Sequence, residues 1–422
     1  MSDYPSVYRI KQKFARSQLG DLEAAVEQAV DRLFPPGQQS PAPGSTIGIT
    51  VGSRGITNIV PILTSIVAQL KSRELQPFLF ACMGSHGRGE PEGQKEILES
   101  LGITPENIGA PVSCSGEVRL LGHTTKGIQG LPVYCAEEAL SSDGVIVVNR
   151  IKAHTSFSGT YESGMMKMMA VGMGRAKGAS MVHSLGVGRI ADAIPAIAGV
   201  ILERVPVVGG IAIVENEYEE TALIEGIPKA ELWEREKELL ILSKSYMPKL
   251  PVKHMDLCIV KEMGKNYSGT GMDTNIIGRL RIQGIPEPEE PFIQYLGVLD
   301  LSEPSHGNAT GIGLADYTTK RLVSKIDRQA TYLNCMTSGL VVRAAVPMTF
   351  ETDEELMKNA LSILRLAEPS SLKLAIIHNT LHLDEMWVSE ALWREIQDDP
   401  KIELVEVLSA FNSGMRDSFS CK

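Results

Sequence analysis

Residues Thr46-Ile-Gly-Ile-Thr-Val51 form a short apolar stretch, which is followed by the sequence Asn58–Leu70 and then by a second apolar stretch, Pro77-Phe-Leu-Phe-Ala-Cys82. Short continuous apolar runs are typical of buried strands, whereas the apolar residues of Asn58–Leu70 recur with the spacing of an amphipathic helix. The same alternation continues with a helix predicted at Glu90–Leu101 and buried strands predicted at Gly144–Val148 and Val207–Val214. Strands that alternate with helices predict an α/β domain with a mostly parallel sheet.

A second α/β pattern follows a charged, Leu-rich helix expected at Lys229–Leu250. Its predicted strands are Leu257–Val260 and Leu372–Ile377, and its predicted helices are Ile312–Ile326 and Glu355–Leu366. We therefore expect two α/β domains with mostly parallel sheets and the active site in the cleft between them. The expected divisions are a cofactor-binding and catalytic domain at residues 1–248, a substrate domain at 249–395, and a C-terminal segment, 396–422, that packs back on the N-terminal domain.

The composition of the 422-residue chain is that of an ordinary globular protein, with 43% apolar residues and a net charge of -10. No apolar run approaches the roughly 20 residues that a membrane span needs, and the first residues lack an apolar signal core, so we expect a cytoplasmic protein. The six cysteines include no CxxC pair, which disfavours a disulfide framework or a zinc knuckle. The acidic balance disfavours nucleic acid as the main partner.

The segment Asn149–His183 is rich in methionine and glycine and carries a lysine between four methionines. Those methionines are Met165, Met166, Met168 and Met169, which leave little water to solvate the Lys167 ammonium, so its pKa should fall. Between Ile146 and His183 the basic residues are Arg150, Lys152, Lys167, Arg175 and Lys177, against one acid, Glu162. This local charge predicts an anion site, although methionines at helical spacing also fill ordinary cores.

Polar residues follow the predicted strands of the first domain. Arg54 follows the first strand, His86 follows the second within Met83-Gly-Ser-His-Gly-Arg-Gly89, and Arg150 and His154 follow the third. Ligands of open parallel sheets bind at the carboxyl ends of the strands, so these residues are expected to converge.

Arg54, His86, His154, Lys167 and His183 resemble, in order and spacing, the signature of the nickel-dependent lactate racemase family of 2-hydroxyacid racemases and epimerases. The resemblance covers most of the chain and is strongest from Gly52 to Leu185. Members bind the nickel-pincer nucleotide, a pyridinium-3,5-bisthiocarboxylic acid mononucleotide that grips nickel. The resemblance implies that this cofactor is covalently held on Lys167, that His183 is a nickel ligand, and that His86 and His154 are the acid/base pair.

The same resemblance implies the remaining contacts of the site. Arg54 would bind the substrate carboxylate, because its planar guanidinium suits a bidentate partner. Arg175 or Lys177 would neutralise the cofactor phosphate, with a solvated surface position as the alternative for either residue. The expected partners are a small 2-hydroxy acid and the proteins that synthesise the cofactor.

The chain departs from the family pattern at positions that concern the substrate. Val51 replaces an acid, Met165 and Met166 replace small and basic residues, and the interval from His154 to Lys167 is longer. A substrate-binding lysine of the family is replaced by Met272, for which Lys265 is a candidate substitute. We therefore expect a substrate other than lactate, a larger or more polar hydroxy acid such as a sugar acid.

Two alternatives belong to other functional classes. The histidines His86, His154 and His183 could form a zinc or manganese site of a hydrolase or isomerase, although no carboxylate lies at typical ligand spacing. The chain could also be a non-catalytic homologue that binds an anion or nucleotide.

Overall fold

The computed structural model of the protein describes residues 6–35, 41–366 and 368–408. The chain forms two compact units. The N-terminal unit comprises Ala15–Met247, and the C-terminal unit comprises Met1–Phe14 together with Pro248–Lys422. Both are α/β units with mostly parallel sheets, which confirms the predicted fold class.

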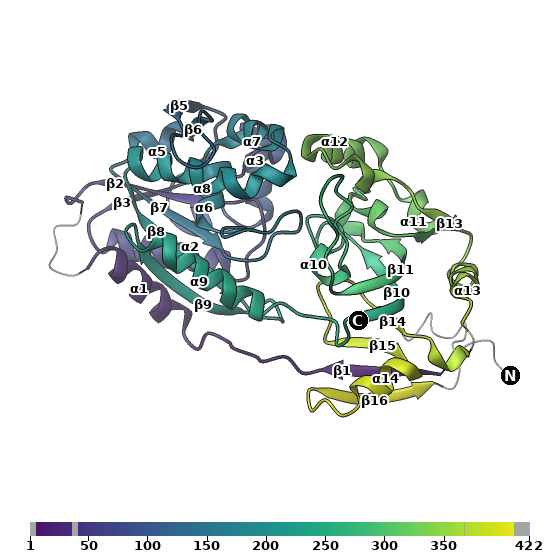
Figure 1. Ribbon diagram of the computed structural model, residues 1–422. Coiled ribbons are helices and arrows are strands. Elements are labelled where there is room, and N and C mark those ends of the chain that lie inside the picture. Colours follow the sequence, from purple (N-terminus) through teal and green to yellow (C-terminus); the bar gives the residue numbers. More distant parts are fainter. Residues whose placement is uncertain (1–5, 36–40, 367, 409–422) are drawn as a thin grey trace. The chain divides into compact units, whose positions relative to one another are not determined.

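The N-terminal unit is built on a six-stranded sheet with the order β4-β3-β2-β7-β8-β9 (Figure 1). All neighbours are parallel except β8 and β9, which are antiparallel. The strands are β2 (Thr46–Val51), β3 (Gln76–Ala81), β4 (Val112–Ser113), β7 (Gly144–Arg150), β8 (Val207–Glu215) and β9 (Thr221–Pro228). A separate hairpin consists of β5 (Val118–His123) and β6 (Pro132–Ala136).

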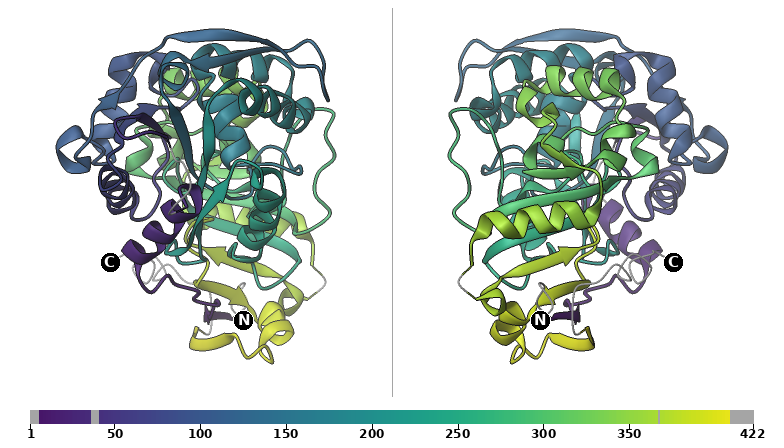
Figure 2. Two further views of the ribbon diagram at one scale, coloured as in Figure 1. Left: turned by 90° about the vertical axis from the view of Figure 1, so that its left-hand side faces the viewer. Right: turned by 90° about the vertical axis from the view of Figure 1, so that its right-hand side faces the viewer.

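Helices cover both faces of this sheet. Successive side chains of a buried strand point to opposite faces, so each face carries apolar side chains that pack against helices. In β7, Val145 and Val147 belong to one core and Ile146 and Val148 to the other. The first core includes residues of α6 (Met165–Lys167), α7 (Arg175–Ser184), α8 (Val187–Arg204) and α9 (Leu232–Ser245). The second includes residues of α1 (Leu22–Leu33), α2 (Ile59–Lys71), α3 (Pro91–Ser100) and α4 (Pro105–Ile108). Figure 2 shows these helices from two further sides. The short helix α5 spans Glu137–Ser141.

The C-terminal unit has an eight-stranded sheet with the order β13-β12-β11-β10-β14-β15-β1-β16. The strands from β13 to β14 are parallel, and β15, β1 and β16 add antiparallel pairs. The strands are β1 (Val7–Gln12), β10 (His254–Met263), β11 (Phe292–Leu301), β12 (Tyr317–Thr319), β13 (Met348–Phe350), β14 (Leu374–Ile377), β15 (Glu385–Ser389) and β16 (Ile402–Leu408). The helices are α10 (Thr274–Ile277), α11 (Lys320–Ser324), α12 (Arg328–Ser338), α13 (Asp353–Leu364) and α14 (Glu390–Ile396).

Three sequence-based expectations need correction. The first residues of the chain do not belong to the N-terminal unit, because β1 pairs with β15 and β16. The helix expected at Ile312–Ile326 is a short 3-10 turn followed by β12 and α11. The part of the C-terminal segment that forms β16 joins the sheet of the C-terminal unit, and residues 409–422 lie outside the described residues.

The cysteines of the described ranges are all free thiols: Cys82, Cys114, Cys135, Cys258 and Cys335. Cys421 lies outside the described residues. In the described ranges, every helix is too short or too polar to span a bilayer.

Candidate functional site

The expected site residues of the N-terminal unit lie in loops at the point where the strand order of its sheet reverses, between β2 and β7. From β2 the chain passes to β3 on one side, whereas β7 lies on the other side of β2. The loops that follow β2 and β7 therefore leave the sheet in opposite directions, which is the position at which open parallel sheets bind ligands. Ser53 and Arg54 follow β2, and His154 lies in the loop that follows β7.

The loop after β3 carries His86 to the end of β2. Ser53 Oγ and His86 Nδ1 are 2.5 Å apart, so two successive strands supply a hydrogen-bonded pair. The loop needs glycine at Gly87, which has φ +64° and where a Cβ atom would lie 2.5 Å from the carbonyl carbon of Gly93. His86 itself is exposed to solvent. The Gly-Ser-His-Gly sequence thus forms a tight loop that presents an oriented, accessible imidazole.

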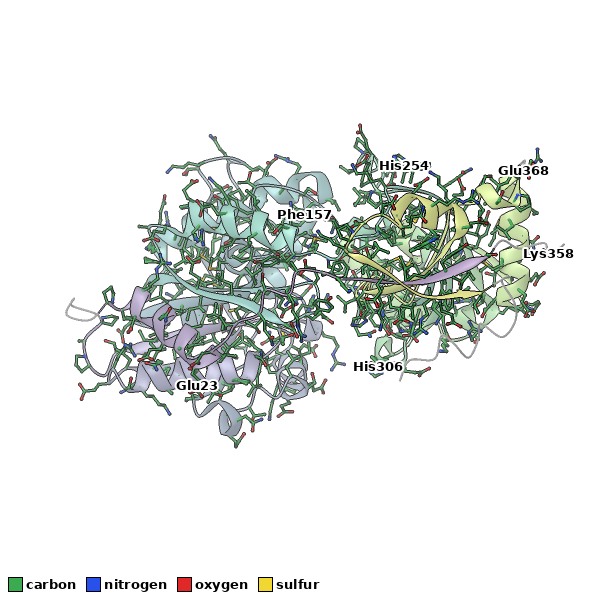
Figure 3. The ribbon with its side chains drawn as sticks, turned by 90° about the horizontal axis from the view of Figure 1, so that it is seen from below. Glu23, Phe157, His254, His306, Lys358 and Glu368 are labelled. Atoms are coloured by element: carbon green, nitrogen blue, oxygen red, sulfur yellow. The ribbon has the colours of Figure 1, made fainter. Side chains whose placement is uncertain are left out.

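His154 is held by its own loop. Its backbone N–H donates to Glu162 Oε2 at 2.7 Å, and its Nδ1 accepts a hydrogen bond from the backbone N–H of Ser156 at 3.1 Å. Its ring stacks on Phe157, which is labelled in Figure 3, with centroids 4.1 Å apart. Because Nδ1 is an acceptor, the neutral imidazole carries its proton on Nε2. The second imidazole is therefore also oriented.

Lys167 lies in α6 and is partly buried, whereas the other residues of 165–170 are buried. Met165, Met166 and Met169 are 0% exposed. Burial, with a further contribution from the charge of Arg54, lowers the pKa of Lys167 to about 8. The sequence-based expectation of a lowered pKa is confirmed, and the neutral amine is accessible near physiological pH.

His183 lies near the end of α7 and is coupled to the same group. Burial, and after it the charge of Lys167, lowers the pKa of His183. A histidine with a lowered pKa stays neutral at pH 7 and keeps a nitrogen lone pair for a metal or a proton. The charge of Arg54 thus acts on Lys167, and the charge of Lys167 acts on His183.

A π-helical turn, η2 (Met168–Gly172), connects Lys167 to α7. It packs closely on the loops of the sheet: a Cβ atom at Gly172 would lie 2.7 Å from the carbonyl oxygen of Cys82, and one at Gly52 would lie 3.3 Å from the Met168 methyl group. Single π-helical turns are rare and occur frequently at functional sites. Here the turn brings the chain that carries Lys167 against the ends of β2 and β3.

Arg150 and Glu215, at the ends of β7 and β8, form a largely buried ion pair. Glu215 Oε1 also accepts the backbone N–H of Thr57 at 2.8 Å, which ties the loop of Arg54 to β8. Burial is the main cause of a lowered pKa of Arg150, and the charges of Glu219 and Arg54 act on it in opposite directions. Arg150 is therefore a neighbour of Arg54, and Glu215 balances the charge of Arg150.

The two residues expected at a cofactor phosphate differ in their surroundings. Arg175 is 1% exposed, and its three nitrogens donate to Ala81 O, Glu117 O and Glu138 Oε1. The Arg175 guanidinium thus anchors the start of α7 to the protein. Lys177 is exposed, with its Nζ 4.7 Å from the centroid of the Tyr134 ring.

Lys265 belongs to the C-terminal unit, where its Nζ donates to Gly269 O at 2.6 Å and to Asn334 Oδ1 at 2.7 Å. Met272, which stands in place of a substrate-binding lysine of the family, is 0% exposed and fills the core. A role of Lys265 at the substrate stays a prediction.

Within the described ranges, no three His, Cys, Asp or Glu side chains are grouped so that they could hold a metal ion. A zinc or manganese site made by His86, His154 and His183 therefore has no support in the geometry. A metal with a single protein ligand, such as His183, would need its other donors from a bound cofactor.

Sequence reasoning missed Ser53, Glu162, Glu215 and Glu236 as parts of the site. Ser53 and Glu215 carry a usable signal, because each lies at the end of a predicted parallel strand. Glu162 is 1% exposed although it is the one acid in a basic segment, and its Oε1 accepts from Lys244 Nζ at 2.6 Å.

The solved structures that are similar to the chain include the following two. A protein from Thermotoga maritima, solved by a structural genomics consortium, has a TM-score of 0.51 at 13% identity, over 85% of this chain and 94% of that one. The lactate racemase apoprotein from Thermoanaerobacterium thermosaccharolyticum has a TM-score of 0.50 at 12% identity, over 88% of this chain and 98% of that one. The fold is lactate racemase-like. No family model and no curated protein matches the sequence, so the similarity to lactate racemase is shown for the fold alone.

Proposed function

We propose that the protein is a racemase or epimerase that inverts C2 of a 2-hydroxy acid, with a nickel-pincer nucleotide bound covalently to Lys167. The observation that carries the proposal is the coupled pair of Lys167, whose pKa is about 8, and His183, whose pKa is lowered. It is supported by their position at the switch point of a lactate racemase-like fold.

The residues present fit this cofactor. Bond formation at Lys167 requires the neutral amine, and its lowered pKa makes that form accessible. Nickel with soft sulfur donors accepts one neutral imidazole, which His183 would supply. When bound, the cofactor supplies the centre that accepts a hydride from the substrate carbon and returns it.

The chain's own residues would move the proton and orient the substrate. His86 and His154 would take the hydroxyl proton, one for each enantiomer, and each such acid/base contribution is worth about 10²–10⁴-fold in rate. Ser53 orients the ring of His86, and the N–H of Ser156 does so for His154. Arg54, which is exposed beside Lys167, would bind the substrate carboxylate.

The cofactor phosphate would be bound by Lys177, an exposed residue, while Arg175 holds the start of α7. Lys265 is proposed as a substrate contact of the C-terminal unit. Because the departures at Val51 and Met272 concern substrate contacts of the family pattern, the proposed substrate is a hydroxy acid other than lactate, a larger or more polar one such as a sugar acid. The proposed setting is the cytoplasm, with the cofactor-synthesis proteins as partners.

The test is intact-mass and nickel analysis of protein produced in cells that make the cofactor. We expect bound nickel and a covalent mass increase that maps to Lys167 and is lost in Lys167→Ala. An unmodified Lys167 under these conditions would refute the proposal. A panel of hydroxy acids in deuterated water, monitored for epimers, then identifies the substrate. Unchanged activity in both His86→Ala and His154→Ala would contradict their acid/base role.

A further inference from the structure

Glu236, on α9, is 1% exposed and lies against the start of the Lys167 turn. Its Oε2 accepts the backbone N–H of Met166 at 3.0 Å, and Oε1 lies 3.3 Å from the same nitrogen. The first N–H groups of a helical turn have no partner within the turn, so an external acceptor stabilises them. Glu236 supplies that acceptor from an element about 70 residues further along the chain.

Gly164 makes room for this contact. It precedes α6 and has no side chain that could cap the turn, and a Cβ atom there would lie 2.3 Å from Glu236 Oε1 and 2.9 Å from its Cδ. The carbonyl oxygen of Gly164 accepts a hydrogen bond from Asn149 Nδ2 at 2.8 Å. The start of the turn is thereby attached to β7 through Asn149 and to α9 through Glu236.

We propose that Glu236 is a positioning residue that, together with Gly164, holds the turn carrying Lys167 in place. Its hydrogen bond to Met166 lies one residue from the lysine, so the carboxyl fixes the backbone from which the amine projects. The consequence for catalysis rests on the proposed function, whereas the structural role does not. Burial raises the pKa of Glu236 to about 8, which favours a neutral acceptor that glutamine can replace.

The structural role is tested by hydrogen exchange of the full-length apoprotein, followed by mass spectrometry of peptides that span residues 164–168. In Glu236→Ala we expect exchange in this segment to accelerate about tenfold or more, because a buried N–H loses its acceptor. Glu236→Gln should keep exchange within about threefold of the wild type, because its amide oxygen still accepts. Glu234→Gln, on the exposed side of the same helix, is the control.

Gly164→Ala provides a second route if Glu236→Ala does not fold. The added methyl group displaces the carboxyl, so exchange in 164–168 should accelerate although residue 236 is still glutamate, and unchanged exchange in Gly164→Ala would contradict the proposal. Where Glu236→Ala folds, the effects of the two substitutions should be far from additive in the double variant, since both remove one contact. Unchanged exchange in Glu236→Ala, or equal acceleration in Glu236→Ala and Glu236→Gln, would overturn the proposal.

The catalytic consequence is measured in cells that make the cofactor. Loading of Lys167 should fall about tenfold in Glu236→Ala and be restored by Glu236→Gln, while the wild type is loaded. Equal loading of the wild type and Glu236→Ala would overturn this consequence. If the wild type itself stays unmodified, the proposed function fails, and the exchange result still decides the role of Glu236.

Discussion

The pKa of Lys167 is lowered by two different effects. Burial removes water from the amine, and the Arg54 charge adds repulsion, in that order of importance. With a pKa of about 8, half of the amine is neutral at pH 8, whereas a lysine with the ordinary pKa of 10.5 is roughly 0.3% neutral there. The run of methionines lies beside the lysine in sequence, whereas Arg54 reaches it only through the fold.

Replacing Arg54 should therefore raise the pKa of Lys167. We expect an increase of up to about one unit in Arg54→Leu, because the repulsive charge is removed while the methionines remain. The measurement is the pH dependence of reductive methylation at Lys167 in the apoprotein, followed by peptide mass spectrometry. Arg119→Leu, which removes an exposed arginine, is the control. A midpoint that stays at the wild-type value would contradict the coupling.

Ser53 should affect the rate of catalysis because it orients the ring of His86. Ser53→Ala removes the hydroxyl 2.5 Å from Nδ1 and with it one contact that orients the ring, and we expect kcat/KM of the loaded enzyme to fall by roughly tenfold. Ser85→Ala, next to His86 in sequence, is the matched control and should stay within about twofold. If both variants lose activity equally, the effect belongs to the loop and not to the hydrogen bond.

At the scale of elements, the π-helical turn η2 decides how Lys167 meets the sheet. Its last residue, Gly172, approaches the Met168 sulfur and the Cys82 carbonyl oxygen so closely that no side chain fits. The same approach places Val171 3.5 Å from a Cβ atom built at Gly84, in the loop of His86. The contact between Val171 and Gly84 therefore connects η2, which follows Lys167, to the loop that carries His86.

Adding one methyl group at this contact should be costly. We expect Gly172→Ala to lower the free energy of unfolding by about 1–3 kcal/mol, because backbone and core atoms must move. Gly178→Ala, inside α7, meets no atom closer than 3.9 Å and should stabilise by up to about 1 kcal/mol. Denaturant unfolding measures both. Equal destabilisation by the two substitutions would show that the close approach at Gly172 is not the cause.

At the scale of the whole molecule, the N-terminal strand belongs to the C-terminal unit. β1 lies between β15 and β16, with Val7 and Ile10 fully buried, so the first and last strands of the described residues share one sheet. The chain enters the N-terminal unit after Phe14 and leaves it after Met247. The N-terminal unit is thus an insertion between the strands of the other unit.

A substitution in β1 should therefore destabilise the C-terminal unit, although β1 precedes the N-terminal unit in the sequence. Ile10→Ala is expected to cost the C-terminal unit about 2–5 kcal/mol through loss of core contacts. In a Trp233→Phe background the fluorescence of Trp387 and Trp393 reports on that unit alone. We expect their unfolding midpoint to fall in Ile10→Ala and to remain unchanged in Val26→Ala, a core substitution of the N-terminal unit. The reverse pattern would contradict the assignment of β1.

The sequence alone determined the parallel core of the N-terminal unit and the expectation of a low pKa for Lys167. Buried parallel strands appear as continuous apolar runs, and the run of methionines around Lys167 predicts a buried amine. These are local patterns, which a sequence displays directly. The convergence of the loops also follows from the strand predictions, because loops after parallel strands meet at one edge, whereas the position of the switch point depends on the strand order.

Only the tertiary structure decided the contacts between distant segments. The strand Tyr317–Thr319 lies where the sequence predicts part of a helix, because three residues carry too little periodicity to indicate a strand. β1 has no partner nearby in sequence, and Glu236 acts on Met166 from another helix. Such contacts depend on how layers pack, so the capped lysine turn and the oriented His86 could be found only once the chain was folded.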